Sequence, residues 1–184
     1  MARRMLVHLR RFAPDRRAVA ALEFAIIAPL LLVLYSGGVD VTRAIVFHQK
    51  LQQATTAIND LVSQATEIRK AEVLDSFTIA DAVMAGFPNK GLVIKVAGIL
   101  IDGAGNARVD WSIARGIDGD KKGTPYVLPE RMRSLRNQSL IVTETRHYYT
   151  PLMEAILPAR IPMGSVARGR TRGRIPLACV DCGS

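Results

Sequence analysis

Residues 18–39 read AVAALEFAIIAPLLLVLYSGGV, and Glu23 is the one carboxylate among them. At about 1.5 Å of rise per residue, a helix of this length spans the ~30 Å hydrocarbon core of a bilayer. Much of the apolar excess of the chain lies in this block instead of being spread along alternating strands. The sequence therefore predicts a transmembrane helix over residues 19–39.

The charge before this block predicts its orientation. Residues 1–18 carry six arginines and one aspartate, which supply +5 of the formal net charge of +9. Basic residues in a short segment beside a span stay on the cytoplasmic side. We therefore expect residues 1–18 to be a cytoplasmic leader and the chain after the span to lie in the periplasm or outside the cell, anchored in the inner membrane. A nucleic-acid partner would need basic residues interleaved with stacking aromatics, and we predict none.

Glu23 is the residue of the span that most needs an explanation. A carboxylate inside a membrane helix costs a few kcal/mol on insertion scales. In one interpretation it lies near the cytoplasmic end and reaches toward Arg16 and Arg17. In the other interpretation, Glu23 takes part in the assembly of this chain with other subunits.

The residues around Glu23 favour the second interpretation. Two arginines, the small Ala18, four apolar residues, Glu23 and Phe24 follow one another, and Pro29 comes later in the span. This order resembles type IV prepilin-like leaders, specifically those of the TadE-like pseudopilin family of tight-adherence (Flp-type) pilus systems. The segment Thr145–Leu152 also resembles the C-terminal strand of that family.

The resemblance implies a processing step and a set of partners. A prepilin peptidase would cut between Ala18 and Val19, which makes Glu23 the fifth residue of the mature chain, although the family usually has Gly where this chain has Ala18. Glu23 would then pair with the free α-amine of a neighbouring subunit, which offsets the desolvation of both charges. The implied partners are other pilin or pseudopilin subunits, the prepilin peptidase and the inner-membrane assembly platform.

After the span, the chain predicts more helix. An apolar stripe at spacings of three and four indicates that the helix continues on one side of a domain or, alternatively, in a coiled coil with another subunit. We expect Asn59 on its opposite, polar face. A second helix is predicted over 67–85, ended by Gly86 and Pro88. The stripe consists of Ala44, Phe47, Leu51, Ala54, Ile58, Leu61 and Ala65.

The following segments predict strands. Residues 91–101 are rich in β-branched side chains, residues 102–106 carry turn chemistry, and residues 108–113 alternate polar with apolar, as in a β-hairpin. Residues 139–149 predict a third long strand. The expected fold class is α+β, pilin-like, with the long N-terminal helix packed on a small antiparallel sheet of three to four strands, in a domain covering residues 40–159.

The remaining residues, 160–184, are expected to form a basic, mobile tail. Cys179 and Cys182 at its end suit a redox pair, half of a metal site or a local disulfide. Because no second Cys or His pair lies nearby in the sequence, we expect the disulfide and no metal.

The sequence offers no catalytic pattern, because His8, His48 and His147 are scattered and none belongs to a metal or nucleophile motif. We predict no catalytic residues and no cofactor. The expected function is that of a minor pseudopilin that contributes to pilus assembly, secretion or adhesion. The alternative is an uncleaved single-span envelope protein with a periplasmic binding or export-accessory domain. A third hypothesis, a cleaved secreted enzyme, would place the mature N-terminus near Gly37.

Overall fold

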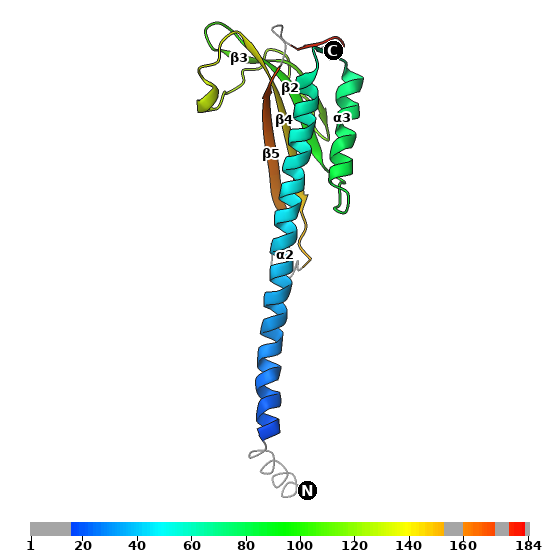
Figure 1. Ribbon diagram of the computed structural model, residues 1–184, viewed down its shortest axis with the longest axis vertical. Helices are drawn as coiled ribbons and strands as arrows, with labels where there is room; N and C mark the ends of the chain where they lie inside the picture. The colour runs from blue at the N-terminus through cyan, green and yellow to red at the C-terminus, as the bar shows by residue number, and fades with distance from the viewer. Residues whose placement is uncertain (1–15, 153–159, 172–176, 183–184) are drawn as a thin grey trace, which may run out of the picture. The chain divides into compact units, whose positions relative to one another are not determined.

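A computed structural model describes residues 16–152, 160–171 and 177–182 (Figure 1). The chain divides into two compact units, residues 1–43 and residues 44–184. Helix α2 (Arg16–Gln64) contributes its proximal part to the first unit and its distal part to the second. The helix continues without a break across Pro29, although proline has no N–H to donate to the carbonyl of Ala25.

The second unit is built on a four-stranded antiparallel sheet in the order β3-β2-β4-β5. Its strands are β2 (Val93–Ile101), β3 (Ala107–Arg115), β4 (Gln138–Tyr149) and β5 (Ile161–Arg170). The β2–β3 hairpin and β4 lie where the sequence predicts strands. Together with the long N-terminal helix, the sheet confirms the predicted α+β fold class.

The tight turn between β2 and β3 is closed by Asp102. Its carboxylate accepts hydrogen bonds from the backbone N–H of Asn106 at 2.8 Å and from the side-chain amide of Asn106 at 2.9 Å. Gly105 adopts a φ of 91°, a conformation that glycine takes without the steric cost of a side chain. Within β2, before this turn, the pairing with β3 shifts register at a bulge between Gly98 and Ile99.

The helical face of the sheet holds the larger core. The distal part of α2 and helix α3 (Lys70–Val83) pack on this face (Figure 1). Phe47, Leu51 and Ile58 of α2 are buried there, as the stripe predicts. Leu61 departs from the prediction, because it is 51% exposed while the adjacent Val62 is buried.

The opposite face of the sheet has a smaller apolar cluster. The loop of residues 116–137, which contains the short 3-10 helix η1 (Glu130–Met132), places Leu128 and Leu135 against it. The strand residues of this cluster are Ala97, Ile99, Ile101, Ala107, Val109, Leu140 and Val142.

The expectation of a mobile tail from residue 160 is wrong for residues 161–170, which form β5 along the edge of the sheet. Partly buried residues alternate with exposed ones along this strand, so Ala167 and Gly169 face the helices while Arg168 and Arg170 lie on the exposed side. The arginines and glycines suggested a solvated segment. A strand accommodates them because neighbouring residues point to opposite faces.

The predicted second helix is shorter than expected. Residues 67–68 form the two-residue strand β1 (Glu67–Ile68), and α3 begins only at Lys70. The carboxylate of Glu72 accepts a hydrogen bond from the backbone N–H of Arg69 at 2.9 Å, which satisfies one free donor at the start of the helix. At the other end, the ammonium of Lys50 donates to the carbonyls of Val83 at 2.9 Å and Ala85 at 3.2 Å.

Candidate functional site

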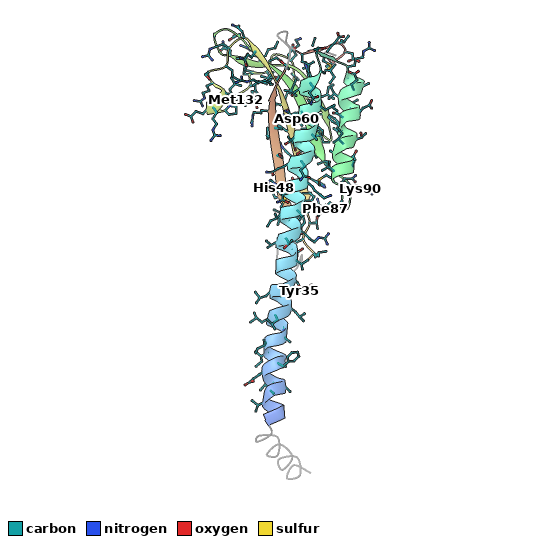
Figure 2. The ribbon with its side chains drawn as sticks, in the orientation of Figure 1. Tyr35, His48, Asp60, Phe87, Lys90 and Met132 are labelled. Atoms are coloured by element: carbon teal, nitrogen blue, oxygen red, sulfur yellow. A yellow bond between two sulfur atoms is a disulfide. The ribbon has the colours of Figure 1, made fainter. Side chains whose placement is uncertain are left out.

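The proximal part of α2 presents apolar side chains on its outside (Figure 2). Phe24 is 70% exposed and Tyr35 is 74% exposed, and the leucines between them are exposed as well. Among the described residues, α2 is the one helix that is long and apolar enough to cross a membrane. Water solvates such a surface poorly, whereas a bilayer or a bundle of similar helices accommodates it.

Glu23 is the one charged residue between Val19 and Val39, and its side chain is exposed on the helix. Its helical neighbours one turn away, Val19, Ala20, Ile26 and Ile27, are apolar. Within the part of the chain that the structure describes, no ion pair includes Glu23. The carboxylate therefore lies on an apolar surface that would be covered by lipid or by other apolar helices.

The proposed cleavage position lies close to Glu23. The peptide bond between Ala18 and Val19 belongs to the first turn of α2, and Glu23 follows Val19 by four residues, or about 6 Å of helical rise. Residues 1–15 lie outside the described residues, so most of the predicted leader is not part of this description. Phe24 and Pro29 are both exposed on the helix, like the apolar residues around them.

Two hydroxyl groups near the end of the apolar segment bond within the helix. Ser36 donates to the carbonyl of Leu32 at 2.7 Å, and Thr42 donates to the carbonyl of Gly38 at 2.9 Å. These bonds to the preceding turn satisfy both donors without water. The polar residues at this end of the segment are therefore compatible with an apolar environment.

The distal part of α2 is held on the sheet by a row of buried polar residues, Thr55, Asn59 and Ser63. The hydroxyl of Thr55 lies 2.6 Å from that of Thr145 in β4. The amide of Asn59 is within hydrogen-bonding distance of the carbonyl of Ile141 and the N–H of Gly169, at 3.0 Å each. This row therefore contacts both β4 and β5.

The prediction that Asn59 lies on the polar outer face of the helix is wrong, because its side chain is buried against the sheet. The spacing in the sequence could have indicated this burial. Thr55, Asn59 and Ser63 are four residues apart, and each directly follows an apolar residue of the buried face, at positions 54, 58 and 62. Gly169 is the matching residue of β5. A Cβ at that position would lie 2.5 Å from both the Asn59 amide and the Ser63 hydroxyl.

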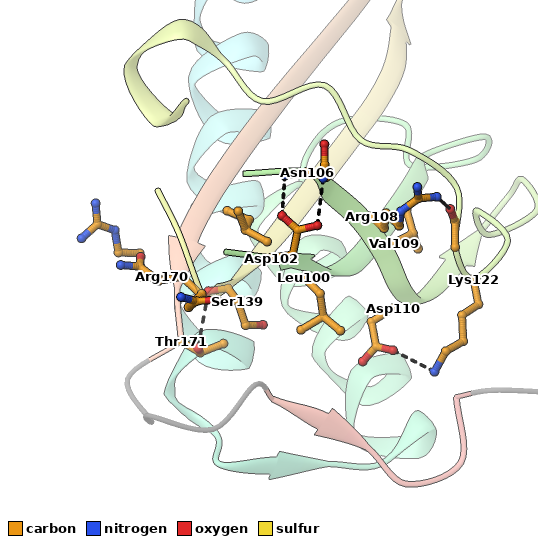
Figure 3. Close-up of a pocket in the computed structure, with 14 residues that line it drawn as sticks. Leu100, Asp102, Asn106, Arg108, Val109, Asp110, Lys122, Ser139, Arg170 and Thr171 are labelled. Carbon is orange, nitrogen blue, oxygen red and sulfur yellow. Dashed lines mark hydrogen bonds and ion pairs between the residues drawn. The ribbon is translucent and has the colours of Figure 1, made fainter. Parts of the chain in front are cut away.

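A pocket of about 870 Å³ lies at the end of the sheet that carries the β2–β3 turn (Figure 3). Among its charged side chains, Lys122 pairs with Asp110 at 2.8 Å, and Arg108 donates to the backbone carbonyl of Gly123 at 3.2 Å. Its other lining residues are Leu100, Ile101, Asp102, Asn106, Val109, Asn137, Gln138, Ser139, Arg170 and Thr171. No histidine is among these lining residues.

The pKa of Asp102 lies below its ordinary value, because its carboxylate accepts hydrogen bonds from the side chain and the backbone of Asn106. Lys95 in β2 behaves differently. Burial disfavours its charged form, but its hydrogen bond to Asp120 at 2.8 Å and the charge of Glu144 at 3.4 Å outweigh that effect and raise its pKa. Both shifts stabilise local structure.

The described histidines lie in separate places. His48 bonds to Gln52 on the same helix, and His147 in β4 is bonded through Nε2 to the carbonyl of Pro88 at 2.6 Å. His8 lies outside the described residues. Cys179 and Cys182 are joined by a disulfide.

The comparisons with known proteins address the N-terminal helix. A family model described as TadE-like protein matches residues 18–58, which include Glu23, Phe24 and Pro29. Neither the curated proteins nor the solved structures contain a significant match. The matched range covers the apolar segment and the apolar stripe of α2 as far as Ile58, and it suggests a protein associated with Tad pili. Residues 18–58 of this chain thus match the TadE-like family model, as the resemblance indicated.

Proposed function

We propose that this chain is a minor pseudopilin of a tight-adherence pilus or a related secretion system. The observation that carries the proposal is the exposed apolar segment of α2 with a single carboxylate, Glu23, inside the range that matches the TadE-like family. The chain is held in the inner membrane by this segment, with its N-terminus in the cytoplasm and the α+β domain outside. Its role is structural, and no catalytic step is assigned to it.

Processing prepares the helix for assembly. The prepilin peptidase cuts between Ala18 and Val19, which removes a net charge of +5 and creates a free α-amine at Val19. Ala18 replaces the glycine usual in the family and still offers the small side chain that the site needs. When the helix leaves the lipid, its apolar surface is covered by the helices of other pilin or pseudopilin subunits.

Glu23 sets how the helix of one subunit is aligned along the helix of the next. In a bundle of apolar helices, an isolated carboxylate carries a large desolvation penalty, and a neighbour's α-amine is the group that offsets it. The assembly platform of the inner membrane would supply the site at which these helices meet. An unpaired Glu23 therefore opposes incorporation, and a paired one fixes the position of one subunit relative to the next.

The experiment is a comparison of Glu23→Gln with Asp60→Asn, a change of the same kind at an exposed position of the same helix. Incorporation into sheared pili is measured by quantitative mass spectrometry, with leader cleavage recorded in the same cells. We expect Glu23→Gln to lower incorporation at least tenfold while cleavage and the Asp60→Asn variant stay normal. Equal incorporation of the two variants would refute the role of Glu23.

The alternative, an uncleaved envelope protein, is favoured by one observation, the Ala18 at the cleavage position. In that case the parent chain keeps its leader in the membrane, as Ala18→Leu does, because the peptidase does not cut after Ala18. In the pseudopilin proposal, Ala18→Gly is cleaved at least as fast as the parent and Ala18→Leu is not cleaved. The lengths of the three chains, measured after membrane extraction, separate the two functions.

A further inference from the structure

The C-terminal segment of residues 177–182 is anchored on the core of the second unit at its start. Leu177 is 1% exposed and belongs to the core on the helical face of the sheet. The indole N–H of Trp111 in β3 donates to the carbonyl of Leu177 at 3.2 Å. A Cβ at Gly98 would collide with that indole ring, so the glycine provides the space in which Trp111 reaches this carbonyl.

The same segment is then bonded to the residues that precede α3. Strand β6 (Ala178–Cys179) pairs in parallel with β1, and the N–H of Val180 donates to the carbonyl of Ile68 at 3.2 Å. Directly afterwards, the carboxylate of Asp181 accepts a hydrogen bond from the N–H of Lys70 at 2.6 Å. Because Lys70 is the first residue of α3, its N–H has no partner within the helix.

Asp181 of the C-terminal segment thus supplies a hydrogen-bond acceptor for a free backbone N–H at the start of α3. A carboxylate at this position satisfies a free donor and lies at the positive end of the helix dipole. The disulfide between Cys179 and Cys182 encloses Val180 and Asp181 in a small ring. Closing that ring limits the conformations of Asp181, so less order has to be gained when the carboxylate binds the Lys70 amide.

We propose that residues 177–182 form a redox-controlled clasp, in which the Cys179–Cys182 disulfide holds Asp181 against the start of α3. Oxidised, the clasp ties β3, β1 and α3 together at one end of the domain. Reduced, it releases Asp181 and exposes the first turn of α3. Disulfides persist in the periplasm and outside the cell and not in the cytoplasm, so the clasp closes only after export, when a disulfide-carrying oxidant takes the two thiol hydrogens of Cys179 and Cys182 and is itself reduced to a dithiol. This timing rests on the proposed location of the domain, whereas the clasp itself does not.

The test uses the purified full-length chain in detergent and measures hydrogen exchange of the amides from Lys70 to Val73. One sample is kept oxidised, and the other is treated with a dithiol, which becomes a cyclic disulfide while Cys179 and Cys182 each gain a hydrogen. Asp181→Ala with intact cysteines is the second probe. Asp60→Ala, which removes an exposed carboxylate from α2, is its control.

We expect reduction and Asp181→Ala each to accelerate exchange of these amides roughly fivefold, the factor for losing a typical helix cap. Asp60→Ala should leave them unchanged. Trypsin cleavage after Arg69 and Lys70 should rise in parallel. Unchanged exchange after complete reduction, or in Asp181→Ala, overturns the clasp. Neither result depends on leader cleavage or pilus incorporation, so the clasp and the pseudopilin role fail separately.

Discussion

Replacing Gly169 with alanine tests how closely α2 packs on β5. The added Cβ would lie 2.5 Å from the Asn59 amide and from the Ser63 hydroxyl, whereas ordinary contact begins at 3.4 Å. Asn59 is 2% exposed and Ser63 is 6% exposed, so neither side chain can turn out into solvent. The helix or the strand must therefore move by almost one ångström.

The expected loss of stability is about 2 kcal/mol, within the usual cost of overpacking a core. For a domain of this size, that loss lowers Tm by roughly 4–8 °C. The measurement is thermal unfolding in detergent, followed by circular dichroism. Gly164→Ala in the same strand is the graded control, because its Cβ would lie 3.2 Å from the carbonyl of Thr145 and needs a smaller adjustment.

A second variant identifies the contact. Ser63→Ala removes the hydroxyl that the new Cβ meets and leaves the Asn59 contact in place. Combined with Gly169→Ala, it should recover part of the lost stability, with a coupling free energy of about 0.5–1 kcal/mol. If Gly169→Ala unfolds within 1 °C of the parent, the close packing of α2 on β5 is not as described.

Two further predictions concern charged groups of the second unit. Because the pKa of Lys95 is raised in the folded domain, its ion pairs stabilise the fold fully below its ordinary value of 10.5, and the contribution disappears as pH rises through the raised value. Lys95→Met should lower the free energy of unfolding by about 1–3 kcal/mol at pH 7 and remove the part of the alkaline loss of stability that comes from Lys95. Identical plots of stability against alkaline pH for the parent and the variant would contradict this prediction. Lys50→Met removes the donor to the carbonyl of Val83 at the end of α3 and to that of Ala85 just after it, and should cost about 1 kcal/mol. The loss is seen as faster hydrogen exchange over residues 80–87 and not at the start of α3.

The features that the sequence predicts correctly are those with a simple periodicity. The apolar block is recognised from its length and its nearly unbroken apolar composition, and the stripe at Phe47, Leu51 and Ile58 follows the helical repeat. The β2–β3 hairpin follows from β-branched runs around a turn, and Asp102 and Gly105 close that turn. These patterns are local, so one segment suffices to recognise each of them.

The features that it misses depend on partners far away in the chain. Strand β5 looks like a solvated tail because of its arginines, and only pairing with β4 explains why Ala167 and Gly169 alternate with them. Asn59 looks like a surface residue until β4 and β5 lie against it. Asp181 has no recognisable role until it reaches the N–H of Lys70, 111 residues earlier in the chain.

The candidate site follows a similar division. Glu23, Phe24 and Pro29 were identified from their order in an apolar block, and the family match covers them. The pairing of Glu23 and the cleavage after Ala18 involve other molecules, which a single chain does not contain. They stay predictions of the pseudopilin proposal.

The most direct test of the central proposal is mass spectrometry of the N-terminus of the membrane-extracted protein, from normal cells and from cells without prepilin peptidase. The pseudopilin proposal predicts a mature chain that begins at Val19 in normal cells and at the uncleaved leader in cells without the peptidase. An intact leader in normal cells would contradict it and leave the uncleaved anchor as the function of the helix.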